Sequence, residues 1–150
     1  MEIKDYFNDL TKKQIIEADN EGRPVRVAIY ARTHQGADNT LLSQIRLSKD
    51  LIGQHSNWVF DESTHLFIDE DGSSMREDRV GFQQMKKAVL GNEFDLLLTA
   101  DISRFSRNAA ITFHTIKKFQ KFGVGVYFIK DNFFTFDESD MYKMNILARL

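Results

Sequence analysis

Arginines that follow two apolar runs are the residues of this chain best suited to chemistry. Arg32 follows the run from Val25 to Ala31, whereas Arg104 and Arg107 follow a second run, Phe94 to Leu98. If both runs are neighbouring strands of a parallel sheet, their carboxyl ends lie together, where such sheets bind ligands. Guanidinium groups bind phosphate oxygens through paired, charge-assisted hydrogen bonds. The sequence therefore predicts a phosphate site in outline.

Strands and helices alternate along the chain. Aliphatic and β-branched runs predict strands at residues 25–31, 94–99 and 124–129, and a strand at 58–60 and 66–68 with an interruption around 62–64. Helical periodicity predicts helices at 40–52, from about Arg79 to 90, at 109–122 with Gly123 as the cap, and at 139–150. Single helices between strands indicate right-handed crossovers. We expect an α/β fold of three layers, Rossmann-type, with a mainly parallel sheet flanked by helices.

Length and composition fit one domain. The chain has 150 residues, of which 42% are hydrophobic, and its 13 phenylalanines and single proline argue against disorder. Apolar residues recur at helical spacing at Ile3, Phe7 and Leu10, and this helical pattern ends at Gly22 to Pro24. We expect an N-terminal extension at 1–24 with a short helix, the main domain at 25–137, and a further helix beginning at 138–150.

Metal and membrane sites find little support. Cysteine is absent and the four histidines are scattered, so we expect no disulfide, no structural metal and no cofactor. The acidic run Asp69, Glu70 and Asp71 has the ligand type for magnesium, but a solvated loop is the favoured interpretation. The amino terminus has no long apolar run for a signal peptide or a membrane span, which predicts a cytoplasmic protein without a membrane partner.

Charge is uneven along the chain. The net charge of −2 is not typical of a nucleic-acid binder, because non-specific DNA affinity comes mainly from clustered lysine and arginine. From Ser103 to Lys130, however, basic residues occur without any acid. The lysines of this segment fit a solvated helix face at least as well as a DNA groove, and both interpretations stay open.

Several motifs in order resemble one known family. These are Tyr30-Ala31-Arg32-Thr33-His34, Ser43-Gln44, Asp71-Gly72-Ser73-Ser74 with Arg79 and Phe82 after it, and Ile102 to Asn108. Together they resemble the N-terminal catalytic domain of the serine recombinases, the resolvase and invertase family, and most of all the large serine recombinases that include phage and mobile-element integrases. The resemblance covers most of residues 25–150.

The resemblance implies site-specific DNA recombination by a dimer or tetramer. It assigns Arg32, Arg79, Arg104 and Arg107 to the scissile phosphate of DNA and its transition state, with Gln44 as a polar neighbour. It also implies that the terminal helix makes the subunit contact, and that this helix continues in the family past the point equivalent to Leu150. We therefore expect a fragment or a truncated gene product that binds DNA poorly alone, with Met141, Met144, Ile146 and Leu147 partly exposed.

His34 occupies the position where the family has its nucleophilic serine. Imidazole is longer than a hydroxymethyl group and usually acts as a base, so the favoured interpretation is that strand cleavage is lost. A phosphohistidine would need the attack geometry to be reset, which is costly. Thr33 as a displaced hydroxyl ranks last, because in an extended strand its side chain points away from that of Arg32.

Two other functions remain as alternatives. A non-catalytic DNA-binding or assembly module could keep the arginines and pair with an active homologue, and His34 favours it. A flavodoxin-like small-molecule domain is weaker, because no glycine-rich G-x-G-x-x-G loop follows any strand. The target site and the outcome, whether integration, excision or inversion, are not encoded in these residues.

Overall fold

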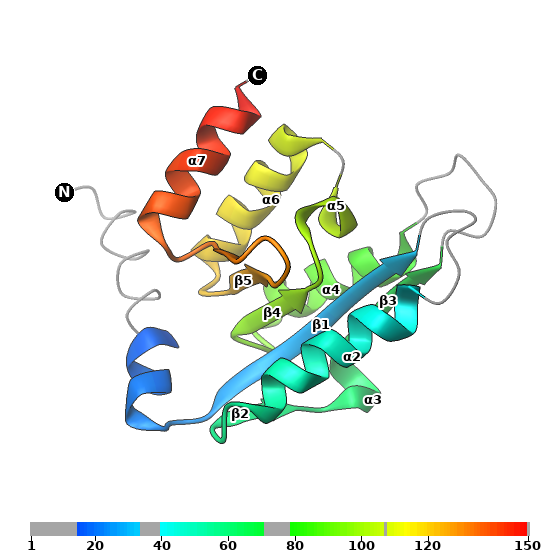
Figure 1. Cartoon of the computed structure of the whole chain (residues 1–150), viewed down its shortest axis with the longest axis vertical. Helices are drawn as coiled ribbons and strands as arrows, with labels where there is room; N and C mark the ends of the chain where they lie inside the picture. The colour runs from blue at the N-terminus through cyan, green and yellow to red at the C-terminus, as the bar shows by residue number, and fades with distance from the viewer. Residues whose placement is uncertain (1–14, 34–39, 71–78, 107, 150) are drawn as a thin grey trace.

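A mainly parallel sheet runs through the protein (Figure 1). The computed structural model describes residues 15–33, 40–70, 79–106 and 108–149. In this part of the chain the strand order is β2-β1-β4-β5-β6, and β3 also pairs with β1. The central strand is β1 (Val25–Thr33), with β4 (Leu96–Thr99) and β5 (Gly125–Phe128) parallel to it on one side. The predicted α/β class and parallel sheet are confirmed.

The other side of β1 pairs with one interrupted strand. β2 (Trp58–Phe60) pairs with the start of β1 and β3 (Leu66–Glu70) with its end, and the helical turn α3 (Glu62–His65) separates them. The side chain of Asp61 caps α3 by accepting from Ser63 N. The predicted interruption is confirmed. The strand continues two residues further than expected, however, so Asp69 and Glu70 belong to β3 and the solvated-loop interpretation was wrong for them.

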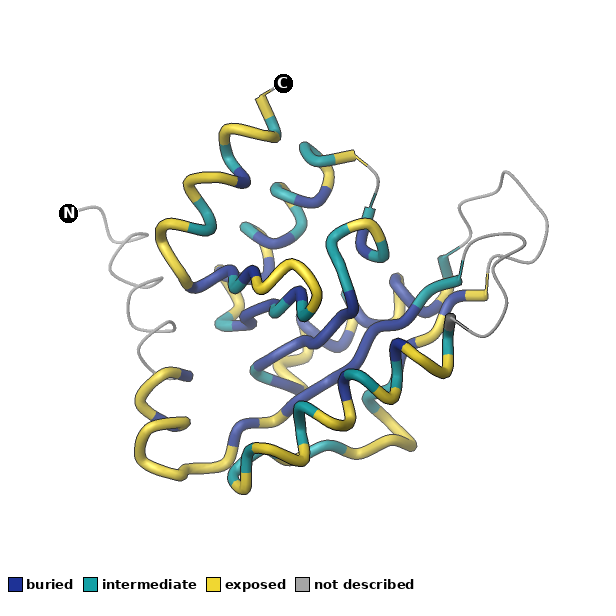
Figure 2. Tube along the Cα trace, in the orientation of Figure 1, coloured by how far each residue is buried: buried dark blue, intermediate teal, exposed yellow. Residues whose placement is uncertain are grey.

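Helices cover both faces of the sheet. Figure 1 shows α2 (Thr40–Gly53) in front of β1 and α4 (Val80–Leu90) behind the sheet. Residues 15–21 are helical, and Ala18 packs with Val25, Val27, Leu96 and Leu98 on the α2 face. The larger core lies on the opposite face, beneath α4, α6 (Ala109–Lys121) and α7 (Glu138–Ala148). Figure 2 shows the central strands as the most continuously buried part of the trace.

Helix α6 has a cap at each end that its sequence specifies. The side chain of Asn108 accepts hydrogen bonds from Ala110 N and Ile111 N. At the other end Gly123 has a φ of 77°, and Val124 N donates to Phe119 O. This left-handed turn is the Schellman motif that glycine favours. Ile116 and Phe119 are buried, as predicted.

The last elements depart from expectation. β6 (Phe133–Phe134) pairs antiparallel with β5 and was not predicted. In α7 Met144 is only 1% exposed, so its predicted exposure was wrong, whereas Ile146 and Leu147 are 45% and 51% exposed. Met144 packs into the core because α7 lies against α6 (Figure 1). The predicted helix positions at Ile3, Phe7 and Leu10 lie outside the described residues.

Candidate active site

Side chains hold the main chain of Arg32 at the end of β1. β4 pairs with β1 only as far as Tyr30, opposite Thr99. Beyond that point the side-chain amide of Gln44, on α2, accepts from Arg32 N at 3.1 Å and donates to Arg32 O at 2.8 Å. Gln44 is 2% exposed. Both polar ends of its amide are therefore used to fix the end of β1 against α2.

Arg79 lies just before α4, and its guanidinium group points to residues of β1 and α5. Its Nη2 donates to the Tyr30 hydroxyl at 2.9 Å and to Arg104 O at 3.2 Å, and its Nε lies 3.3 Å from the same hydroxyl. The guanidinium carbon lies 3.8 Å from the centre of the Phe82 ring, a cation–π contact. These contacts fix the direction of the Arg79 side chain.

Tyr30 and Asp69 support Arg79 from inside the protein. The Tyr30 hydroxyl is fully buried and donates to Asp69 Oδ2 at 2.7 Å. Asp69 also accepts from Gly81 N at 2.7 Å and Phe82 N at 2.9 Å, so its carboxylate caps α4, where the helix dipole favours a negative charge. Burial raises the pKa of Tyr30 well above its usual value, while the charge of Arg79 opposes this shift. Tyr30 therefore stays a neutral phenol that accepts from Arg79 and donates to Asp69.

Gly81 permits this arrangement. A Cβ at this position would lie 2.5 Å from Ile68 O and 2.8 Å from Ile68 C, both main-chain atoms of β3. Only glycine lets the first turn of α4 approach β3 so closely. The close approach brings the amide groups of Gly81 and Phe82 within reach of Asp69.

Arg104 lies on the short helix α5 (Ile102–Phe105) and joins the same group. Its Nη1 donates to Arg32 O at 3.2 Å, and its Nε lies 3.4 Å from the carboxylate of Asp101. Nε is buried and makes no hydrogen bond of normal geometry in the described part of the protein. Arg104 is thus anchored to β1 but keeps donor capacity.

Arg32, Arg79 and Arg104 are therefore linked at the carboxyl ends of the strands. Arg79 donates to the main chain of Arg104, and Arg104 donates to the main chain of Arg32. Toward other described residues, no hydrogen bond comes from Arg79 Nη1, Arg104 Nη2 or the guanidinium group of Arg32. These unused donors can bind an anion. His34 and Arg107 lie outside the described residues, as does the Asp71 to Ser74 segment.

Sequence reasoning did not predict the hydrogen bonds through which Tyr30 and Asp69 support Arg79. Asp69 follows Phe67 at the strand period of two, and both are buried on the side of α4. That alternation was the available signal, and it was missed because a run of three acidic residues is typical of a loop. Tyr30 was read as part of an apolar run, although a buried tyrosine needs a partner for its hydroxyl.

Metal ligation finds no support in the described ranges. No group of three or more histidine, aspartate or glutamate side chains is placed there to hold a metal ion. The carboxylate of Asp69 is already used by two main-chain amides and a phenol. Among the described helices, none is long and apolar enough to cross a membrane.

Comparison with known families decides the identity of the domain. The family model for the resolvase N-terminal domain matches residues 27–150. The chain belongs to this family. Its function class is site-specific DNA recombination of the serine-recombinase type, and resolvase-family recombinases bind DNA and are in general oligomeric. No curated protein sequence matches the chain significantly.

Solved structures have the same fold. The resolvase-family chain is similar to a resolvase-family site-specific recombinase from Streptococcus pneumoniae, with a TM-score of 0.71 and 21% identity over 83% of this chain and 86% of that one. It is also similar to the catalytic domain of TP901-1 integrase, with a TM-score of 0.66 and 23% identity over 83% and 92%. A third similar structure is the catalytic domain of ISC1926 TnpA, an IS607-like serine recombinase. Its TM-score is 0.59, with 20% identity over 81% of this chain and 78% of that one.

Proposed function

We propose that this resolvase-type domain binds a DNA phosphodiester through Arg32, Arg79, Arg104 and Arg107, and that His34 prevents strand cleavage by the route of its family. The observation that carries the proposal is the hydrogen-bonded link between three of these arginines at the end of β1. These links bring guanidinium groups to one edge of the sheet, and the repulsion between nearby cations falls when an anion binds between them or solvent screens them. A phosphodiester supplies the anion.

The guanidinium donors that have no partner among the described residues suit the charge that develops in phosphoryl transfer. Negative charge collects on the non-bridging oxygens, and fixed arginines stabilise it without reorganisation. Gln44 is a positioning residue in this proposal, because its amide fixes the main chain of Arg32. Tyr30 and Asp69 position Arg79 in the same sense.

Strand cleavage in the family needs a hydroxyl. The serine oxygen bonds to phosphorus, the bond to the leaving DNA oxygen breaks, and the new phosphoester keeps the bond energy for rejoining. Position 34 carries an imidazole, so the serine hydroxyl that this step uses is absent here. β1 is extended as far as Thr33, so the side chain of Thr33 lies on the opposite face of the strand from that of Arg32. This supports the view that Thr33 is a poor replacement for the nucleophilic serine.

The phosphate site can be tested by NMR of the arginine Nε–Hε groups. We expect titration with a short DNA duplex to shift the signals of Arg32, Arg79 and Arg104. Arg46 is the control, because it is exposed on α2 and belongs to no part of the site. Shifts that are equal at Arg46 and the site arginines would contradict the proposal, since they would indicate diffuse charge attraction.

The role of His34 can be tested by restoring the hydroxyl. The protein should form no covalent adduct on a nicked suicide DNA substrate that carries its recombination site, whereas His34→Ser within a full-length context should form one, seen by denaturing electrophoresis. A covalent band from the unchanged protein would show that another nucleophile works. A folded serine variant without a band would show that more than the hydroxyl is missing.

We further propose that α7 contributes to self-association. Tyr142, Ile146 and Leu147 are 69%, 45% and 51% exposed on this helix, and exposed apolar side chains at helical spacing favour a partner helix. Ultracentrifugation should detect a concentration-dependent dimer that Ile146→Glu weakens. Ile111→Glu is the matched control, because Ile111 is 53% exposed on α6. Equal effects of both variants would contradict a role for α7.

A further inference from the structure

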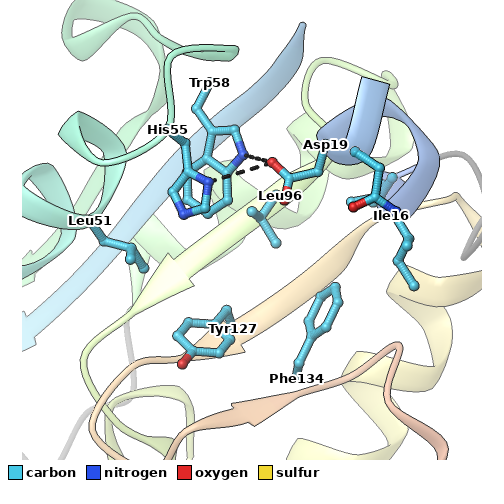
Figure 3. Close-up of a pocket in the computed structure, with 10 residues that line it drawn as sticks. Ile16, Asp19, Leu51, His55, Trp58, Leu96, Tyr127 and Phe134 are labelled. Carbon is cyan, nitrogen blue, oxygen red and sulfur yellow. Dashed lines mark hydrogen bonds and ion pairs between the residues drawn. The ribbon is translucent and has the colours of Figure 1, made fainter. Parts of the chain in front are cut away.

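A pocket of ≈ 270 Å³ lies on the α2 face of the sheet (Figure 3). Its apolar lining comes from the helix at 15–21, α2, and strands β4, β5 and β6: Ile15, Ile16, Leu51, Leu96, Tyr127 and Phe134. Two of the lining residues, Trp58 and Leu96, are the first residues of β2 and β4. The arginines follow the opposite, carboxyl ends of the strands. The pocket is therefore separate from the phosphate site.

An aromatic pair and one carboxylate form the polar side of this pocket. The rings of His55 and Trp58 are stacked, with centroids 3.9 Å apart and planes 7° apart. Trp58 Nε1 donates to Asp19 Oδ1 at 2.9 Å, and His55 Nδ1 lies 3.5 Å from the same oxygen (Figure 3). Asp19 Oδ2 has no partner among the described residues, and the side chain of Asp19 is 39% exposed. One carboxylate oxygen is thus available beside an apolar pocket.

The charge around the pocket is one-sided. Helix residues 15–21 carry Glu17, Asp19 and Glu21 and no lysine or arginine. Glu21 pairs with Arg23, and Asp19 is the acidic residue of this helix that lines the pocket. Ile16, which also lines the pocket, is 39% exposed. A carboxylate at the edge of an apolar pocket that no lysine or arginine lines is complementary to a ligand that is apolar and positively charged.

We infer that this pocket docks a basic segment of a partner protein, which inserts one large apolar side chain and places a lysine or arginine beside Asp19. A volume of ≈ 270 Å³ is at the lower limit for small-molecule sites but suits one anchoring side chain. Such buried anchors commonly carry most of the energy of an interface. Because the pocket and the arginines lie at opposite ends of the strands, the partner and DNA can be bound at once.

The test uses capped peptides and the fluorescence of Trp58, the single tryptophan of the chain. The probe is Lys-Lys-Phe-Leu-Lys-Lys, and its controls are Glu-Glu-Phe-Leu-Glu-Glu and Lys-Lys-Gly-Ser-Lys-Lys. The probe should change the emission of Trp58 in a saturable way and bind about tenfold more tightly than either control, since it alone combines charge with an apolar anchor. Backbone NMR shifts should map to the residues that line the pocket.

Two variants separate the pocket from general charge. Asp19→Asn should weaken binding of the probe about fivefold, whereas Glu17→Gln removes the same charge from the same helix outside the lining and should change it less than about twofold. Equal effects of both variants, or equal binding of all three peptides, would overturn the inference. So would a change of Trp58 emission that follows dimer formation of the protein alone, because the occupant would then be a second copy of this chain.

Discussion

Tyr30→Phe tests whether Arg79 is positioned from inside the protein. The substitution removes one buried oxygen and keeps the ring, so packing against Phe82 and Phe105 is retained. The lost hydroxyl donates to Asp69 and accepts from Arg79. Among the described residues, Arg79 then keeps its bond to Arg104 O and its contacts with the rings of Phe82 and of residue 30.

The expected cost follows from the charge of both partners. Hydrogen bonds to charged groups contribute about 1.5–3 kcal/mol each, and part of this is offset because Asp69 keeps two main-chain donors. We expect the free energy of unfolding to fall by about 2–3 kcal/mol, which for a chain of this length lowers Tm by about 4–12 °C. The Nε–Hε signal of Arg79 should also broaden or shift.

Urea unfolding and NMR measure the two effects. Tyr142→Phe is the matched control, because Tyr142 is 69% exposed and its hydroxyl makes no hydrogen bond to the described protein. It should change stability by less than about 0.5 kcal/mol. If Tyr30→Phe is as mild as this control and leaves the Arg79 signal unchanged, the inner support of Arg79 is not real.

Three further predictions concern the same region. Gly81→Ala should destabilise by about 1–3 kcal/mol, because the new Cβ meets the main chain of Ile68, whereas Gly53→Ala has nothing within 4 Å and should be neutral or stabilising in thermal unfolding. Gln44→Leu should cost about 1–3 kcal/mol in urea unfolding because Arg32 N loses its acceptor, and the exposed Gln84→Leu should not. Because the pKa of Tyr30 is raised in the folded state, ionisation of this phenol above pH 10 favours the unfolded state. The stability advantage of the protein over Tyr30→Phe should therefore be constant below pH 10 and decrease as the pH rises further. An unchanged difference in the free energy of unfolding at pH 11 would contradict this.

The fold could be read from the sequence where local signals agree. The apolar run before Arg32 and the periodic helices that end at Gly91 and Gly123 have boundaries close to those of β1, α4 and α6. β6 was not predicted because a two-residue strand has no periodicity and forms only through its antiparallel pairing with β5. Met144 was expected to be partly exposed, because packing of α7 on α6 depends on tertiary contacts that no local pattern encodes.

The residue types of the candidate site could be predicted from the sequence, but the hydrogen bonds between them could not. The strand-end rule places Arg32 and Arg104 together without knowledge of any contact. The link through Tyr30 and Asp69 depends on the extension of β3 by two residues and on the close approach at Gly81. The first has a local signal in the alternation of Phe67 and Asp69, whereas the close approach at Gly81 is a tertiary feature that no local pattern encodes.

The acceptors that hold Arg79 leave its charge largely intact. Arg79 donates to a phenol and to a main-chain carbonyl, whereas Arg104, whose Nη1 donates to another carbonyl, also has the carboxylate of Asp101 3.4 Å from its Nε. Neutral acceptors fix the direction of a guanidinium group without cancelling its charge, whereas a directly bound carboxylate would compete with a phosphate. The nearest buried carboxylate, Asp69, is kept from Arg79 by the Tyr30 hydroxyl between them. None of these contacts involves position 34, so under the proposed function the replacement of serine by His34 affects the attacking group and not the contacts that hold Arg79 and Arg104.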